Sequence, residues 1–425
     1  MNDGASTRES GPAGSHGLPP VAPPRLRRTL TLPYVVLYGL GVTIGAGIYV
    51  LVGEVIGRSG QYAPVPFLIA SLVMLLPAAV FAEFTGRLPY AAAEAHFVGA
   101  GFNSRALFLV VGLAVAAVGI VSSAAIAHGA VGYLGQLVGL PPVPLLVFVI
   151  VATGIVAGFG IRESIAFAGV LTLVEVAGLA AVVAGAIWSG ADMAERAVEA
   201  VPHSLSPALW QGIAASSLLA FFAFIGFEDI DSIAEETIDP QYTLSRGIFI
   251  TLILTMVIYI AVILAALAAV PADEIAASRA PLALVFARTT GLSPFVITLI
   301  AVVATVNGII VQIIMSARVI YGLANHGRLP AWLARINPVT GTPVAGTALI
   351  VALVLVLALL FPITRLAAWT SAITLAVFVL VCVALARVKR SGAPAPEGTF
   401  IAPVWVPYAG AAACTALLLA GLLAG

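Results

Sequence analysis

The chain has 425 residues, of which 61% are hydrophobic and only 9% are charged. An ordinary soluble domain contains about 25% charged residues, so this composition excludes a soluble globular protein and predicts an all-α polytopic protein with the lipid bilayer as its surroundings. The formal net charge of +0 also excludes a nucleic-acid partner held by phosphate contacts.

The amino-terminal segment is rich in Pro, Gly and Ser and carries Arg25, Arg27 and Arg28. It lacks the apolar stretch and the small-residue cleavage site of a cleaved signal peptide. We expect residues 1–30 to form a disordered cytoplasmic tail ahead of the apolar part of the chain.

Apolar windows long enough to cross a bilayer, which takes about 20 residues, recur along the rest of the chain. They predict eleven spans, at residues 33–56, 64–86, 106–137, 143–160, 164–188, 209–236, 246–270, 293–322, 344–361, 365–386 and 404–424. With the amino terminus inside, fourteen Lys and Arg residues fall on the inner side and five on the outer side. This positive-inside bias predicts a cytoplasmic amino terminus. We expect a multi-pass protein of the plasma membrane, which is the inner membrane in a bacterium.

The first span is unusually rich in glycine, with Gly39, Gly41, Gly45, Gly47 and Gly53. Glycine costs up to about 1 kcal/mol relative to alanine inside a helix. One interpretation is close packing against neighbouring helices, where glycine is common in membranes. The other is an interruption that frees backbone groups for a ligand.

The sixth span contains a second irregularity, in which Gly226 precedes Glu228, Asp229 and Asp231. A charge at membrane depth costs about 2.5–3.5 kcal/mol even on the mildest scale. A helix that unwinds near Gly226 and faces a wet cavity explains this sequence better than a regular helix. Two interrupted helices about 180 residues apart, each opening a five-helix block, indicate inverted repeats with a substrate between the breaks.

At these residues the sequence resembles the amino acid–polyamine–organocation superfamily, in particular the bacterial branch similar to cationic amino acid transporters. The resemblance implies two inverted five-helix repeats, a secondary permease that works by alternating access, coupling to protons or exchange, and no cofactor. We expect a core over residues 31–390, with repeats at 33–188 and 209–386, and a loop with one extra helix over 391–425. The residues that carry the likeness are 43–48 with Gly53, 82–89, 221–228 with 234–237, and 317–330 with 337–338 and 342–343.

An amino acid presents a carboxylate and an ammonium group to such a site. Unwound backbone at the first break offers free N–H groups beside a half-helix N-terminus, which suits the carboxylate. Carbonyls freed at the second break suit the ammonium group, and the resemblance assigns this role to Phe222 and Ile225. Glu228 could meet a basic side chain, line the pore or hold the sixth helix, and a packing role for both breaks also stays open. The predicted substrate-binding residues are Thr43, Ile44, Gly45, Ala46, Gly47, Phe222, Ile225, Gly226 and Glu228.

Glu175 is the only charged residue within residues 166–188. The resemblance places it beside the first helix, where proton-coupled relatives carry a lysine in the position of a sodium ion. Desolvation favours the neutral form of a buried carboxyl, so we predict that Glu175 couples transport to protons. A protonated structural acid and a carboxylate that helps to bind a cation are the alternatives.

Four other polar residues are candidates for a relay or a gate. His128 is the only histidine deep in an apolar segment and serves either packing or proton transfer. Asn307 in the eighth span is open in the same way. Glu83 and Arg87, at the inner end of the second span, form either a cytoplasmic gate or a snorkelling surface pair.

Enzymatic function is not expected, because the chain has no HExxH, GxSxG or P-loop motif and no scaffold of metal-binding cysteines. The alternatives that remain are a transporter of polyamines or other small organic amines, and an amino-acid sensor or channel on the same scaffold. The coupling ion, the individual substrate and any accessory subunit stay open.

Overall fold

The protein is described by a computed structural model over residues 28–88, 93–160, 165–325 and 327–424. The described chain is helical and contains no strand, only an isolated bridge between Leu30 and Thr237. Within the described residues, ten helical segments are long and apolar enough to cross a membrane, and Val344–Leu360 is an additional, shorter apolar helix. The prediction of an all-α polytopic membrane protein is confirmed.

The observed spans follow the predicted windows closely, because a run of apolar residues is a local signal. They are α1 (Leu32–Ser59), α2 (Pro64–Arg87), α4 (Arg105–Val138), α5 (Pro142–Phe159), α6 (Ile165–Trp188), α8 (Pro207–Phe222) with the 3₁₀ helix η2 (Phe227–Glu236), α9 (Pro240–Ala269), α12 (Phe295–Asn325), α13 (Val344–Leu360), α14 (Ile363–Arg390) and α15 (Val406–Ala424). A proline in the first turn starts α1, α2, α5, α8 and α9, where its missing N–H costs nothing.

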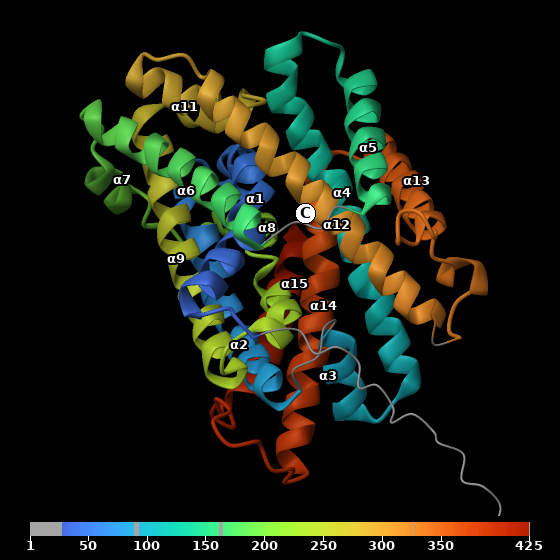
Figure 1. The fold of residues 1–425 in the computed structure, drawn as a ribbon. Helices are drawn as coiled ribbons and strands as arrows, with labels where there is room; N and C mark the ends of the chain where they lie inside the picture. The colour runs from blue at the N-terminus through green and yellow to red at the C-terminus, as the bar shows by residue number, and fades with distance from the viewer. Residues whose placement is uncertain (1–27, 89–92, 161–164, 326, 425) are drawn as a thin grey trace, which may run out of the picture.

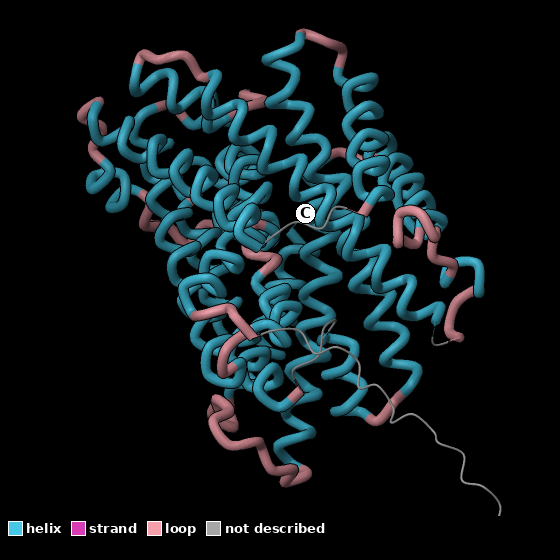
Figure 2. Tube along the Cα trace, in the orientation of Figure 1, coloured by secondary structure: helices cyan, strands magenta, loops and turns pink. Residues whose placement is uncertain are grey.

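The connections contain short helices that the apolar pattern does not predict. They are η1 (Gly60–Tyr62), α3 (Ala93–Phe102), α7 (Met193–Glu199), α10 (Ala272–Ala277), α11 (Pro281–Thr290) and η3 (Ala331–Ala334). Most loops lie at the two ends of the bundle (Figure 2). Of these short helices, α3 contributes Glu94, Ala95 and His96 to the site described below.

The spans form two groups around a central pair. In Figure 1, α4, α5, α12 and α13 lie together on one side, α2, α6 and α9 lie on the other, and α14 and α15 lie between them. The long helix α4 packs along both α12 and α14, whereas α1 packs against α6, α8 and α9. The helix α1 is therefore enclosed by protein over most of its length.

The predicted pair of Glu83 and Arg87 forms, but it is not a surface pair. The Glu83 carboxylate is fully buried at the end of α2 and lies 2.9 Å from Arg87 Nη2 and 2.7 Å from Lys389 Nζ. The Ala402 N–H also donates to it, at 2.9 Å. These contacts fix the segment after α14 across the end of α2, and a gating role for the pair stays a prediction.

Most of the predicted tail, residues 1–27, lies outside the described residues. Its end is bound to the fold, because the N–H groups of Thr29 and Leu30 both donate to the Glu236 carbonyl, at 2.8 and 3.0 Å. The Ile238 N–H donates back to the Leu30 carbonyl at 2.9 Å. The chain that enters α1 is thus tied to the segment that leaves η2.

Candidate functional site

The first break lies in the middle of α1, where Gly45 has non-helical angles of φ −17° and ψ −126°. Two residues later, Gly47 lies directly against the second break. A Cβ atom added there would stand 2.7 Å from the Cα atom of Ala223, which real contacts do not tolerate. A Cβ atom on Gly45 would meet nothing within 4 Å. Glycine at position 47 therefore lets the two breaks touch, while Gly45 borders open space.

The second break lies between α8 and η2, as the sequence predicts. The α-helix ends at Phe222, Gly226 adopts φ +122°, and the chain resumes as a 3₁₀ helix at Phe227. A Cβ atom on Gly226 would collide with the carbonyl oxygen of Val42 in α1. The positive φ angle and this contact both require glycine.

The two breaks border a cavity of about 630 Å³. Its lining stops at Gly47 in α1, at Ile126 in α4 and at Glu175 in α6, and it begins at Ala304 in α12. From these residues the lining extends toward the end of the bundle where α1 begins, as far as Tyr38 in α1, Phe108 in α4 and Leu323 in α12. The cavity therefore extends toward one end of the bundle, and the two helix breaks lie at its deep end, near the middle of the bundle.

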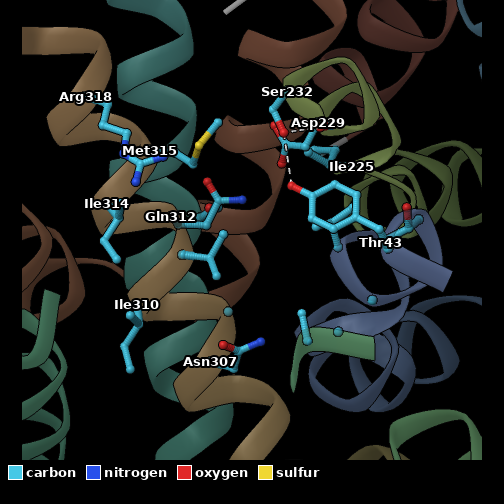
Figure 3. Close-up of a pocket in the computed structure, with 18 of the residues that line it drawn as sticks. Thr43, Ile225, Asp229, Ser232, Asn307, Ile310, Gln312, Ile314, Met315 and Arg318 are labelled. Carbon is cyan, nitrogen blue, oxygen red and sulfur yellow. Dashed lines mark hydrogen bonds between the residues drawn. The ribbon is translucent and has the colours of Figure 1, made fainter. Parts of the chain in front are cut away.

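One wall of the cavity carries a basic side chain and the facing wall carries an acidic one (Figure 3). Asn307, Gln312, Met315 and Arg318 project from α12 on one side, and Asp229 and Ser232 of η2 lie across from them. The Ser232 hydroxyl lies 3.1 Å from the hydroxyl of Tyr38 in α1. A mostly apolar cavity with a few convergent polar groups is typical of a small-molecule site.

The cavity brings together most of the predicted site residues. Those that line it are Thr43, Gly45, Ala46, Gly47, Glu175, Phe222, Ile225 and Asn307. Ile44 is fully buried and is not part of the lining, and Gly226 is covered by the first break. Glu83, Arg87 and His128 lie elsewhere.

His128 lies outside the cavity, and its ring contacts the carboxyl end of the neighbouring span α13. Its Nε2 atom lies 3.2 Å from the Phe361 carbonyl oxygen, at the carboxyl end of α13. This contact satisfies a carbonyl that has no partner within its own helix. The described residues give His128 a structural contact, and a relay role stays a prediction.

A second, smaller pocket of about 40 Å³ adjoins the cavity, and Asp229 borders both. Glu94 from α3 and Glu228 from η2 also line this side pocket, with Thr374 from α14. None of these three carboxyl groups has an ion-pair partner among the described residues. Burial raises the pKa of the Glu94 carboxyl above its ordinary value. Thr374 is only 3% exposed, and its hydroxyl has no hydrogen-bond partner among the described residues.

Glu228 lines this side pocket and not the main cavity. Its carboxylate accepts a hydrogen bond of 2.9 Å from the N–H of Gly226, so it caps the second break. Glu94 and Asp229 were not predicted as site residues. Asp229 carries a signal in the sequence, as a charge at membrane depth, whereas Glu94 carries none because it lies in a connection.

Glu175 lines the main cavity with only 2% of its surface exposed. Its Oε2 atom has no hydrogen-bond partner among the described residues. The Tyr49 hydroxyl donates to its backbone carbonyl at 2.9 Å, which holds α6 against α1 but leaves Oε2 without a partner. A buried polar atom without a partner costs free energy, so this carboxyl group is a candidate for binding a group that enters the cavity.

Comparisons with known proteins show the family to which the chain belongs. The amino acid permease family model matches residues 30–425. The chain is 31% identical to cationic amino acid transporter 2, vacuolar, of Arabidopsis thaliana over 85% of its own length and 60% of that relative's length. It is 25% identical to a branched-chain amino acid permease of Bacillus subtilis, over 88% of its own length and 83% of the relative's.

A solved structure shares the fold. It is the substrate-bound, outward-open state of a Na⁺-coupled sialic acid symporter, with a TM-score of 0.57 and 13% identity, covering 93% of this chain and 90% of that one. The named sequence relatives are transporters or permeases, which agrees with the expectation that this chain is not an enzyme. The chain belongs to the amino acid permease family.

Proposed function

We propose that the chain is a secondary transporter that moves amino acids across a membrane by alternating access. The observation that carries this proposal is the contact of two helix breaks at the deep end of a cavity that extends toward one end of the bundle. A site near the middle of the membrane, reached from one side at a time, is what alternating access requires. The family membership supports the same function.

The polarity of the breaks suggests how an amino acid binds. At the first break the backbone leaves helical geometry at Gly45, and we assign its N–H groups to the carboxylate, together with the hydroxyl of Thr43, whose Oγ1 atom is buried and has no partner among the described residues. At the second break the Phe222 carbonyl accepts a hydrogen bond from the Ile225 N–H at 3.2 Å and has a second lone pair for the ammonium group, which would also meet the Ile225 carbonyl. The carboxylate then faces α1 and the ammonium group faces η2.

Valine substitutions at the first break test this site. Gly47→Val inserts bulk where a single Cβ atom already meets Ala223, and Gly45→Val fills the open space that we assign to the substrate. We expect both variants to insert but to lose amino-acid binding, measured by thermal shift. Gly135→Ala is the matched control, because a Cβ atom there meets nothing within 4 Å and lies outside the cavity. Retained affinity in Gly45→Val would remove the carboxylate site.

Counterflow in proteoliposomes separates a carrier from a sensor or a channel on the same fold. Only a carrier exchanges labelled substrate for unlabelled substrate through a site that faces one side at a time. We expect the wild type to show this exchange with an amino acid. A polyamine has no carboxylate and would leave the first break unused, so cadaverine should exchange much more slowly than lysine.

We propose further that the substrate is a cationic amino acid. Asp229 borders both the cavity and the side pocket, with the carboxyl groups of Glu94 and Glu228 behind it. Arg318 lines the opposite wall of the cavity but forms no ion pair with Asp229 among the described residues. A positively charged side chain that reaches Asp229 would supply the ion-pair partner that this carboxyl group lacks there. The plant relative is named for cationic substrates and the Bacillus relative for branched-chain ones, so the choice must be measured.

Asp229→Asn tests this choice. We expect the affinity for lysine and arginine to fall about tenfold or more, since hydrogen bonds to charged groups contribute about 1.5–3 kcal/mol, and the affinity for leucine to stay nearly unchanged. Glu236→Gln is the control, because Glu236 lines the main cavity but not the side pocket. Equal losses for basic and neutral substrates would contradict the proposed role.

We propose the plasma membrane as the location and the cytoplasm as the side on which α1 begins. The excess of Lys and Arg at that end supports this orientation, and the described cavity then faces inward. A cysteine placed in the amino-terminal tail should react with an impermeant thiol reagent only after the cells are opened. Labelling in intact cells would reverse the orientation.

We also propose that Glu175 couples transport to protons. Its carboxyl faces the cavity without a hydrogen-bond partner for Oε2 in the described chain, which argues against an acid satisfied by backbone. Gaining or losing a proton there would change the interaction of α6 with α1 and bias one state over the other.

A further inference from the structure

Tyr259 of α9 joins the two helix breaks through one hydroxyl group. This hydroxyl lies 3.0 Å from the carbonyl oxygen of Thr43 and 2.9 Å from that of Ala223. Thr43 stands two residues before Gly45, and Ala223 three residues before Gly226. The tyrosine therefore binds one carbonyl from each segment at the point where its helix is interrupted.

The aromatic ring of Tyr259 is held in place by the surrounding side chains. It is fully buried, with its centroid 6.0 Å from that of Phe67 in an edge-on contact and 5.2 Å from that of Phe224. A ring fixed between α2 and the second break cannot follow either break independently. Because a hydroxyl has a single proton, the two carbonyls share one donor and their separation is limited.

We propose that Tyr259 is a positioning residue for substrate binding, and that its hydroxyl sets the spacing of the two breaks so that one amino acid reaches both. This inference rests on the proposed function, in which the carboxylate binds the first break and the ammonium group the second. Tyr259 is not among the residues that line the cavity, so it acts through the backbone and not by contact with the substrate.

Tyr259→Phe removes the hydroxyl and keeps the ring. Tyr133→Phe is the matched control, because Tyr133 is also fully buried and its hydroxyl donates to a carbonyl of α1, that of Tyr49, at 2.9 Å. The control removes a bond of the same kind without a link to the second break. Both variants are purified as full chains, and their melting temperatures and ligand affinities are measured against the wild type.

The informative ligands engage either both breaks or only one. Lysine carries both groups, cadaverine lacks the carboxylate, and ε-aminocaproate lacks the α-ammonium group; leucine, isoamylamine and isocaproate form the neutral set. In Tyr259→Phe we expect the affinity for the amino acid to fall about tenfold, while the weak affinities for the one-ended analogues change little. The preference for the two-ended ligand should shrink by the same factor, and Tyr133→Phe should keep it.

Two results would overturn the inference. The first is a Tyr259→Phe variant with unchanged preference for the amino acid over its one-ended analogues. The second is an equal loss in Tyr259→Phe and Tyr133→Phe that follows the loss of melting temperature, which indicates a structural role. A wild type that binds no amino acid, or a Gly45→Val variant that binds normally, refutes the proposed function instead, so the two failures are distinguishable.

Discussion

The two helix breaks contain the same kind of residue but carry opposite chemistry. Around Gly45 the chain is neutral, and the acidic residues of the cavity wall, Glu175, Asp229 and Glu236, lie on other elements. After Gly226 the chain carries Glu228, Asp229 and Asp231 within one short 3₁₀ helix. In the proposed site the first break binds the carboxylate and the second binds the ammonium group.

Under the proposed function, this difference would orient a zwitterionic substrate. Glycine provides the close approach at both breaks, at Gly47 and at Gly226, so the geometry is shared. The charges that follow only the second break then decide which end of a substrate binds where. Changes that remove the geometry should affect all substrates, and changes that remove a charge should affect only some of them.

The largest effect is expected from Gly226→Ala. Alanine is strained at φ +122°, which costs about 1–3 kcal/mol, and its Cβ atom would push the second break away from Val42 in the first. We expect loss of binding for every amino acid and a lower melting temperature. Binding by isothermal titration and thermal unfolding in detergent measure both effects.

Gly158→Ala provides the comparison for this variant. A Cβ atom at Gly158 meets nothing within 4 Å, and the residue lies in α5 outside the cavity. It should bind as the wild type does. If Gly226→Ala also binds normally, the contact between the breaks is not needed for the site.

The next effect concerns coupling and not affinity. Glu175→Gln should mimic the protonated carboxyl, because the amide is neutral and of similar shape. We expect this variant to bind and exchange substrate but to fail to concentrate it in response to a pH gradient. Counterflow and pH-driven uptake in the same proteoliposomes measure the two activities. Accumulation at the wild-type level would make Glu175 structural and place the coupling elsewhere.

The spans and the breaks were predictable because their signals are local in the sequence. Apolar windows predicted all eleven spans, and glycines followed by charges predicted the interruption near Gly226. The 3₁₀ helix after Gly226 was not predicted, because no residue pattern in this acidic segment distinguishes a 3₁₀ helix from an α-helix. The inverted-repeat relation between the two halves stays a prediction.

Contacts between distant segments were not predictable from one sequence. Glu83 and Arg87 stand four residues apart, which predicts their pairing, but nothing in the sequence places Lys389 against the same carboxylate. The side pocket was also not predictable, because it is formed by segments that are distant in the sequence and Glu94 reaches it from a connection between spans. Tyr259 is an ordinary aromatic residue of an apolar helix until the fold sets it between the two breaks.

The smallest effect is expected from Glu228→Gln, which removes a charge at the second break but keeps an acceptor for the Gly226 N–H. The break should therefore keep its shape, and the melting temperature should stay close to that of the wild type. Because Glu228 lies behind Asp229 in the side pocket, we expect a loss of about threefold to tenfold for lysine and little change for leucine. Glu228→Ala is the necessary comparison, since it removes the charge and the cap together and should weaken both substrates. Competition binding with the two amino acids separates these results. Equal losses for lysine and leucine in Glu228→Gln would mean that the carboxylate serves only to hold the break.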